Sequence, residues 1–191
     1  MTKIFGAVLA GGRSSRMGKD KRFLEFKGKS FLEKSCELLS QALQQASSEL
    51  IILGNIDGFR CIKDENIGFG PLEGIRCLLK AKVNCDAFLV VPVDMPQLDQ
   101  EAIKLLINHF LTCSKSTEGV IFEQSELPLI LRNSERVLSV VESLIVQSNS
   151  RKRSFKELYQ LLIVNKFKIN TIEKLKNINT EDEYIMCLSS N

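Results

Sequence analysis

Residues 7–21 read Ala-Val-Leu-Ala-Gly-Gly-Arg-Ser-Ser-Arg-Met-Gly-Lys-Asp-Lys, and the rest of the chain can be interpreted from this stretch. An apolar run from Ile4 to Leu9 stops at Gly11 and Gly12, and a small, polar and basic loop follows. Glycines let backbone N–H groups approach a ligand closely and face its phosphate oxygens. Lysine and arginine add charge-assisted donors. The stretch therefore predicts a polyphosphate site at the carboxyl end of a strand, where open α/β sheets bind their ligands.

Two familiar phosphate-binding motifs do not fit this loop. A P-loop has four residues between its glycines and a serine or threonine after its lysine. Here five residues separate Gly12 from Gly18, and Lys19 is followed by Asp20. The dinucleotide motif G-x-G-x-x-G is absent from the loop as well. For the glycines and cations alone, a glycine turn followed by a solvated charged loop remains the alternative interpretation.

Length and composition limit the class of protein. The 191 residues suit a single α/β domain spanning 1–191, without a repeat or a linker. A net charge of +3 and the absence of tryptophan give no argument for nucleic-acid or membrane binding. No apolar run approaches the roughly 18 residues of a membrane span, and we expect no signal peptide. The six cysteines are scattered without a C-x-x-C pair, which disfavours zinc and favours a reducing, cytoplasmic location.

Apolar periodicity and capping residues predict that strands and helices alternate, which gives a mainly parallel sheet. Strands are expected after the first one at 50–53, 87–91, 119–122 and 127–132, with further candidates at 161–164, 167–169 and just before Thr180. Pro128 cannot donate to a ladder, so 127–132 is expected to be an edge or antiparallel strand. Helices are expected at 31–46, 71–80, 100–111 and 134–147, and after Ser154 and Thr180.

A single carboxylate follows the most strand-like run of the chain. Residues 87–91 lead into Pro-Val-Asp-Met-Pro at 92–96, so Asp94 is held between two prolines that restrict the backbone. A carboxylate fixed in this way can hold Mg²⁺, which needs only one or two protein carboxylates beside substrate phosphates. Capping of the next turn is the alternative role for Asp94.

Four polar segments follow predicted strands and are expected to share one edge of the sheet. They span 10–21, 54–55, 63–74 and 92–96. In the third segment Pro71 suits the first position of a helix, and Gly74 lets backbone approach a ligand or a neighbouring strand. Together these segments could hold Mg²⁺ and a nucleoside triphosphate.

The string Leu-Ala-Gly-Gly-x-Ser-x-Arg-Met-Gly-x-Asp-Lys at 9–21 resembles the signature loop of nucleotidyltransferases with a Rossmann-like fold. Within them it is most similar to the molybdenum cofactor guanylyltransferases, which also carry Gly-Pro-Leu-x-Gly-Ile, here at 70–75. The Pro-x-Asp-x-Pro motif and an Asn-x-Asn-Thr run at 177–180 extend the resemblance over nearly the whole chain. The chain departs from the family at Val93, often a cysteine, and at Gly54, where a polar nucleotide contact would be expected.

The resemblance implies a three-layer α/β/α fold of the nucleotide-diphospho-sugar transferase type and transfer of GMP from GTP to molybdopterin. It implies that Arg16 contacts the β- and γ-phosphates, that Lys21 contacts the α-phosphate, and that Asp94 holds Mg²⁺. The implied nucleotide contacts are Leu9, Ala10, Gly11, Gly12, Asn55, Asp64 and Gly74, and the implied acceptor contacts are Pro128, Arg151 and Asn179. From the residues alone, Asp64 and Asn179 could equally be turn residues, and 151–153 could be a solvated loop. Other cofactor-biosynthesis proteins and target molybdoenzymes are possible partners.

Three rival interpretations stay open at this point. A cytidylyltransferase for the same cofactor is one, although such relatives tend to have Leu-Ala-Ala-Gly where this chain has Leu-Ala-Gly-Gly. A sugar-phosphate nucleotidyltransferase is another, although those enzymes are usually longer. The third is a nucleotide-binding regulator without turnover, which the presence of both Lys21 and Asp94 disfavours.

Overall fold

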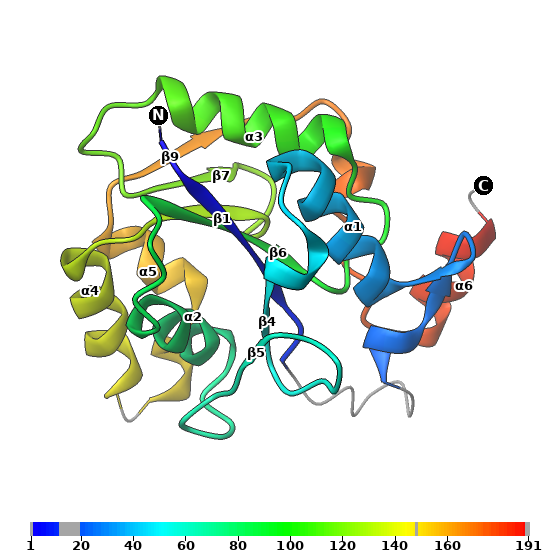
Figure 1. Cartoon of the computed structure of the whole chain (residues 1–191), viewed down its shortest axis with the longest axis horizontal. Helices are drawn as coiled ribbons and strands as arrows, with labels where there is room; N and C mark the ends of the chain where they lie inside the picture. Colours follow the sequence, from blue (N-terminus) through cyan, green and yellow to red (C-terminus); the bar gives the residue numbers. More distant parts are fainter. Residues whose placement is uncertain (1, 12–19, 148, 190–191) are drawn as a thin grey trace.

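The computed structural model describes residues 2–11, 20–147 and 149–189 of the chain. Its centre is a seven-stranded sheet with the order β5-β4-β1-β6-β8-β7-β9 (Figure 1). Strand β8 runs antiparallel to β6 and β7, and the other pairs are parallel. The expected mainly parallel sheet with an antiparallel strand is thus confirmed. The strands are β1 (Ile4–Leu9), β4 (Ile51–Leu53), β5 (Cys61–Ile62), β6 (Ala87–Pro92), β7 (Gly119–Phe122), β8 (Leu129–Arg132) and β9 (Val164–Phe167).

Helices cover both faces of the sheet and make three layers (Figure 1). Neighbouring residues of a strand point to opposite faces, so Val8 of β1 joins one apolar core while Ala7 and Leu9 join the other. The first core contains α1 (Phe31–Leu43) and α3 (Gln100–Thr112). The second contains α2 (Pro71–Lys80), α4 (Glu135–Ile145) and α5 (Phe155–Leu161). Among the described helices, none combines the length and apolar character needed to cross a bilayer.

Side-chain caps fix where the helices begin. Ser30 accepts a hydrogen bond from the Glu33 amide, and Glu33 bonds back to Ser30, which forms the expected capping box of α1. The helix ends earlier than predicted, at Leu43, because Gln44 takes a left-handed conformation with φ of 53°. Such caps are each worth about 1 kcal/mol of stability. Further caps are Asp99 at α3, Ser134 at α4 and Ser154 at α5.

Two strand predictions were wrong in their details. The strand at 127–132, expected to be an edge or antiparallel strand, is antiparallel to both neighbours, begins only at Leu129 and lies inside the sheet between β6 and β7. Pro128 precedes the paired residues, so its missing N–H costs no ladder bond. The two candidates at 161–164 and 167–169 are instead one strand, β9, because α5 extends through Leu161.

The C-terminal segment crosses back to the carboxyl end of the sheet. The strand expected before Thr180 is instead a 3₁₀ turn, Ile172–Leu175, and α6 (Glu181–Ser189) follows. The Ile178 amide donates to the Asp94 carbonyl at 2.8 Å. Helix α6 lies beside the small hairpin of β2 (Glu25–Phe26) and β3 (Lys29–Ser30), where the Tyr184 hydroxyl donates to the Glu25 carbonyl at 2.7 Å (Figure 1).

Candidate active site

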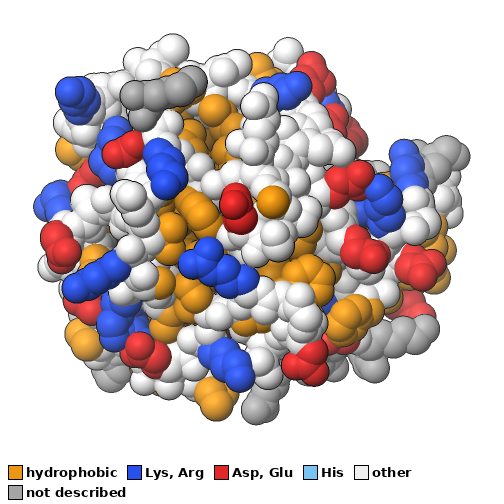
Figure 2. All heavy atoms as spheres, viewed as in Figure 1, with side chains coloured by type: hydrophobic (Ala, Val, Ile, Leu, Met, Phe, Trp, Pro, Cys, Tyr) orange, Lys and Arg blue, Asp and Glu red, His pale blue; other side chains and the backbone are white. Residues whose placement is uncertain are grey.

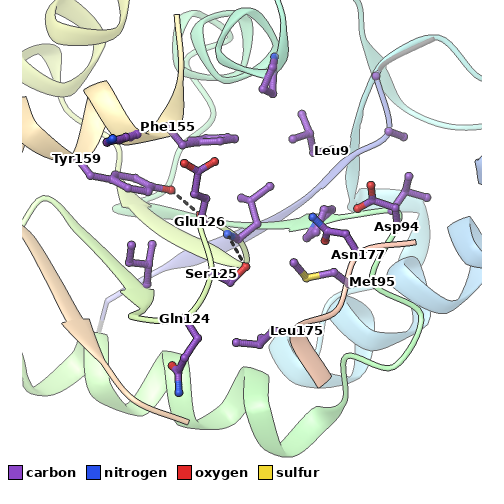
Figure 3. A pocket seen from close by; sticks show the side chains of 18 of the residues that line it. Leu9, Asp94, Met95, Gln124, Ser125, Glu126, Phe155, Tyr159, Leu175 and Asn177 are labelled. Carbon is purple, nitrogen blue, oxygen red and sulfur yellow. Dashed lines mark hydrogen bonds between the residues drawn. The ribbon is translucent and has the colours of Figure 1, made fainter. Parts of the chain in front are cut away.

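A cavity of about 890 Å³ opens at the carboxyl ends of β1 and β6 (Figure 3). We call one side the β1–β6 wall, with Leu9, Ala10, Gly11, Lys21, Arg22, Pro71, Pro92, Val93, Asp94 and Met95. We call the other the β7–α5 wall, with Ile121, Glu123, Gln124, Ser125, Glu126, Leu127, Phe155, Lys156, Tyr159, Gln160 and Lys166. Leu175 and Asn177 complete the lining. The volume suits a cavity that binds small molecules.

Strand register brings the predicted residues of the β1–β6 wall together. Leu9 lies opposite Pro92 in the parallel β1–β6 pair, and the Val93 amide donates to the Leu9 carbonyl at 3.1 Å. The loops that leave the two strands therefore start side by side. This explains in physical terms why residues 10 and 11 meet segment 92–96 at one sheet edge.

Lys21 and Asp94 lie next to each other in this cavity. The Lys21 Nζ is 3.7 Å from Asp94 Oδ2 and donates a hydrogen bond of 2.7 Å to Asn179 Oδ1. Both side chains are largely enclosed, with 15% and 23% of their surface exposed. Burial raises the pKa of Asp94, and the nearby Lys21 ammonium partly opposes that rise. The structure thus brings three of the predicted residues into one cluster.

Glu183, which was not among the predicted site residues, fixes the position of Asn179. Its carboxylate accepts hydrogen bonds from the Asn179 amide at 2.6 Å and the Thr180 amide at 3.0 Å. The Glu183 amide donates to the Thr180 hydroxyl, so the two form a capping box for α6. These backbone bonds, the one from Asn179 first, lower the pKa of Glu183. The spacing of Thr180 and Glu183, Thr-x-x-Glu, is the sequence pattern that indicates this capping role.

Asp64 faces the two glycines that were predicted to bind nucleotide. A Cβ added at Gly74 would lie 3.6 Å from Asp64 Oδ1, and one at Gly11 would lie 3.9 Å from Asp64 Oδ2. Burial, followed by repulsion from Glu73, raises the pKa of Asp64. Gly11, Asp64 and Gly74 therefore converge at the start of α2, whereas Asn55 is exposed and uses its carbonyl to accept from Arg22 Nη1 at 3.1 Å.

A buried ion pair braces the loop that carries Asp64. Glu73 is fully buried and accepts from Arg76 Nε at 2.9 Å and Nη2 at 2.7 Å. It also accepts from the amide and side chain of Asn66, both at 2.9 Å. The Arg76 bond lowers the pKa of Glu73 to about 2. Glu65, Glu73 and Cys77 are close enough to hold a metal, but Arg76 already bonds both carboxylates, so this group does not fit one.

Gly54 has a backbone role. Its φ is +148°, and an added Cβ would lie 3.4 Å from the carbonyl carbon and oxygen of Ala10. The backbone that leaves β4 therefore passes close to the backbone that follows β1. This close approach explains why position 54 is a glycine, although the family resemblance predicted a polar residue there that contacts the nucleotide.

The remaining predicted residues are placed as follows. Gly12 and Arg16 lie outside the described residues. Pro128 is buried next to Leu127, which lines the cavity, and Arg151 is exposed in the 3₁₀ turn Ser150–Lys152. Among the described cavity-lining residues, neither Pro128 nor Arg151 is present.

Arg153 is the more enclosed cation of the 151–153 run. Its guanidinium carbon lies 4.1 Å from the centre of the Phe69 ring, in the loop just before Pro71. Its Nε atom is buried and has no hydrogen-bond partner among the described residues. Like Pro128 and Arg151, Arg153 is not among the described residues that line the cavity. The sequence alone did not show which of Arg151 and Arg153 is the more enclosed.

Charge is spread over the face drawn in Figure 2, where acidic and basic side chains are interspersed among the described residues. The local groups of the cavity, rather than a broad field of one sign, therefore set the chemistry of this site.

Comparisons with known proteins agree with this architecture. Residues 6–164 match the MobA-like NTP transferase domain. A relative from Xanthomonas euvesicatoria, named molybdenum cofactor guanylyltransferase, is 32% identical over 189 residues, which cover 97% of this chain and 95% of the relative. A probable molybdenum cofactor guanylyltransferase from Methanocaldococcus jannaschii is 27% identical, with 96% of this chain and 97% of the relative covered.

A solved structure extends the likeness to the fold. The crystal structure of molybdopterin-guanine dinucleotide biosynthesis protein A from Archaeoglobus fulgidus superimposes with a TM-score of 0.74, at 19% identity, over 97% of each chain. The three-layer fold expected from the signature loop is therefore confirmed. The family match over residues 6–164 and the near full-length relatives lead to one conclusion: this chain belongs to the MobA-like NTP transferase family.

Proposed function

We infer that this chain transfers GMP from GTP to molybdopterin and releases pyrophosphate. The observation that carries the proposal is the meeting of Lys21 and Asp94 in a cavity of about 890 Å³, large enough for a donor and an acceptor. The names of its near full-length relatives supply the identity of both substrates.

The reaction is an in-line displacement at the α-phosphorus of GTP. An oxygen of the acceptor's phosphate forms a bond to the α-phosphorus, and the bond from that phosphorus to the bridging oxygen of the β-phosphate breaks. Pyrophosphate leaves with the electron pair. The acceptor phosphate is already ionised, so no general base is required. Such chemistry asks the protein for positioning and charge neutralisation, and Lys21 would stabilise the charge that develops at the α-phosphate.

Asp94 fits the role of a magnesium ligand. It supplies hard carboxylate oxygens inside the cavity, and Mg²⁺ commonly takes its other ligands from phosphates and water. Bound Mg²⁺ would neutralise phosphate charge and align the two substrates. The Lys21 ammonium beside Asp94 would keep this carboxylate ionised while the cavity waits for the metal.

The two walls are proposed to take different substrates. Leu9, Ala10, Gly11, Asp64 and Gly74 would bind the nucleotide, with Asn55 near the opening and Gly12 and Arg16, by sequence alone, at the phosphates. Asn179 would meet the acceptor phosphate beside Lys21. Pro128 and Arg151 remain proposals for the acceptor, and we add Arg153, whose guanidinium lies over Phe69 in the loop before Pro71.

One experiment tests this function directly. The purified protein is incubated with Mg²⁺, molybdopterin and GTP, CTP, UTP or ATP in turn, and pyrophosphate and dinucleotide products are measured. We expect GTP to give a product with the mass of molybdopterin guanine dinucleotide. Selective use of CTP would replace this proposal with cytidylyl transfer, and GTP binding without product would indicate a regulator.

We also propose the setting of the reaction. Six scattered cysteines favour a reducing, cytoplasmic location, and the absence of a linker in the sequence favours a single domain. The product would pass to other proteins of molybdenum cofactor biosynthesis or to target molybdoenzymes. Pull-down of such proteins with the purified chain, with and without GTP and molybdopterin, is the corresponding measurement.

A further inference from the structure

The turn between β7 and β8 is held rigidly against its surroundings. The Gln124 side chain donates to the Ile169 carbonyl at 2.7 Å and accepts from the Ile169 amide at 3.3 Å. The Leu127 amide donates to the Ser125 hydroxyl at 3.4 Å. The buried Tyr159 hydroxyl donates to the Glu126 carbonyl at 2.6 Å (Figure 3). The turn therefore presents the Glu126 side chain from a preorganised backbone.

The Glu126 carboxylate lies in the cavity without a partner of its own. It points toward Phe155 in Figure 3, whereas Gln124 points away from the cavity. Among the described residues, none donates a hydrogen bond or forms an ion pair with this carboxylate, although Lys156 and Lys166 line the same wall. Glu126 is exposed, so solvent or a ligand meets its oxygens.

The Glu126 carboxylate would weaken the binding of these substrates unless it accepted hydrogen bonds from one of them. GTP and the phosphate of molybdopterin are anions, and a carboxylate repels them. The part of molybdopterin that carries no negative charge and offers N–H groups is the aminopyrimidinone edge of its pterin ring. There the 2-amino group and N3–H lie side by side, as two parallel donors that match the two oxygens of one carboxylate.

We propose that Glu126 recognises the pterin edge of the acceptor by accepting hydrogen bonds from its 2-amino group and N3–H. This inference rests on the proposed function. Guanine has a similar edge, but Gly11, which is proposed to bind the nucleotide, lies on the β1–β6 wall, with Asp64 beside it and beside Gly74. Phe155 and Tyr159 give the β7–α5 wall an apolar surface for the flat ring. Glu126 thus acts as a specificity residue for the acceptor.

The test compares two ligands that differ at the recognised edge. 6-Methylpterin has the 2-amino group, and 6-methyllumazine has an oxygen in its place. Binding of each to the full chain is followed by ligand fluorescence without GTP, so this measurement requires no turnover. We expect wild type to bind the pterin at least about tenfold more tightly, and Glu126→Gln to lose that preference.

Kinetics of transfer give the second measurement. Glu126→Gln is expected to raise KM for molybdopterin at least about tenfold and to leave KM for GTP within about twofold. Glu142→Gln is the control, because Glu142 is exposed on α4 and does not line the cavity, and it should leave both KM values unchanged. Since Tyr159 bonds the Glu126 carbonyl and not its side chain, the variant should unfold at the wild-type temperature.

Three results would overturn the inference. They are equal binding of the two ligands by wild type, a pterin preference that survives in Glu126→Gln, and a rise in KM for GTP instead of molybdopterin. A wild-type protein that prefers 6-methylpterin yet makes no dinucleotide would refute the proposed function and leave the Glu126 assignment standing. Normal transfer by wild type, together with an unchanged KM for molybdopterin in Glu126→Gln, would refute the Glu126 assignment and leave the proposed function standing.

Discussion

The Lys21 ammonium lies 3.7 Å from the Asp94 carboxylate, although the two residues follow different strands of the sheet. Lys21 belongs to the 3₁₀ turn Lys21–Phe23 after β1, and Asp94 follows β6. Each charge limits the cost of burying the other. The pair also places a cation and a metal-binding carboxylate at one point of the cavity, which is the arrangement that a phosphate-transfer site requires.

The first prediction concerns Asp94. Asp94→Asn is expected to reduce pyrophosphate release at least about 100-fold, because it removes the charge that holds the metal. Because burial raises the Asp94 pKa, the carboxylate is less favourable in the folded than in the unfolded chain, so the variant with a neutral side chain of the same shape should melt no lower than wild type. A coupled pyrophosphate assay and thermal unfolding measure the two effects.

Asp86 serves as a matched control, because it lies just before β6, the strand that Asp94 follows. It is exposed and accepts a hydrogen bond from the Lys3 amide at 2.7 Å. Asp86→Asn should stay within about twofold of wild-type activity. Retained activity in Asp94→Asn, or an equal loss in both variants, would contradict the assignment of Asp94.

The second prediction concerns pH. Because burial raises the pKa of Asp94 above its usual 3.8, its carboxylate ionises later than an exposed aspartate as pH increases. The pH dependence of kcat/KM for GTP reports groups of the free enzyme. Its acid limb should therefore have an apparent pKa above 3.8. Lys21→Met removes the ammonium that opposes the shift, and carboxyl-carbon NMR should then show a still higher Asp94 pKa. An unchanged or lower value in that variant would mean that Lys21 does not act on Asp94.

The third prediction concerns Asn179, which accepts the 2.7 Å hydrogen bond from Lys21. Asn179→Ala is expected to lower kcat about tenfold, because the ammonium loses the bond that orients it. Asn170→Ala, at an exposed bend, is the control and should leave kcat unchanged. A similar kcat in both variants would assign Asn179 to the turn alone.

The fourth prediction separates Arg153 from Arg151. Arg153→Ala should raise KM for molybdopterin about tenfold, because Arg153 is the more enclosed cation of the run and its guanidinium lies over Phe69, close in sequence to the cavity-lining Pro71. Arg153→Lys should recover only part of that loss, since a lysine keeps the charge without the planar fork. Arg151→Ala should change KM by less than about twofold. A larger rise in KM for Arg151→Ala than for Arg153→Ala would instead support Arg151, the residue assigned from the sequence.

The fifth prediction concerns the brace under Asp64. Glu73→Ala should destabilise the fold by about 3–5 kcal/mol, because it leaves Arg76 buried without its partner. The folded-state pKa of Glu73, about 2, lies below the usual 4.5, so its contribution to stability is full above 4.5 and is lost as pH falls from there toward 2. Urea unfolding across this range should show that loss in wild type and not in Glu73→Gln. Glu65→Gln, at the exposed partner of Arg76, should cost less than about 1 kcal/mol.

The sequence predicted the features that depend on neighbouring residues. Ser30 with Glu33, Asp99 and Ser154 mark helix starts that the structure reproduces, because a cap involves residues only a turn apart. The predicted carboxyl-end convergence of 10–21 with 92–96 also follows from simple topology, since both segments leave parallel strands.

The features that were missed depend on residues far apart in the chain. Glu126 and Arg153 belong to no motif, and their surroundings form only when the β7–β8 turn and α5 reach the sheet. For 127–132 the sequence left an edge strand and an antiparallel strand open, because Pro128 cannot donate to a ladder. The structure makes this strand antiparallel and starts it at Leu129, two residues later than expected, a shift that hydrophobicity does not encode.

The contact of Ile178 with the Asp94 carbonyl has a consequence for how the protein is made. A ribosome produces β1 and β6 long before residues 177–184, so a nascent chain can form its parallel strands while Lys21 still lacks Asn179. The bond that orients Lys21 then forms only after residues 177–184 have been synthesised, and a product that stops before them would contain the cavity without this bond.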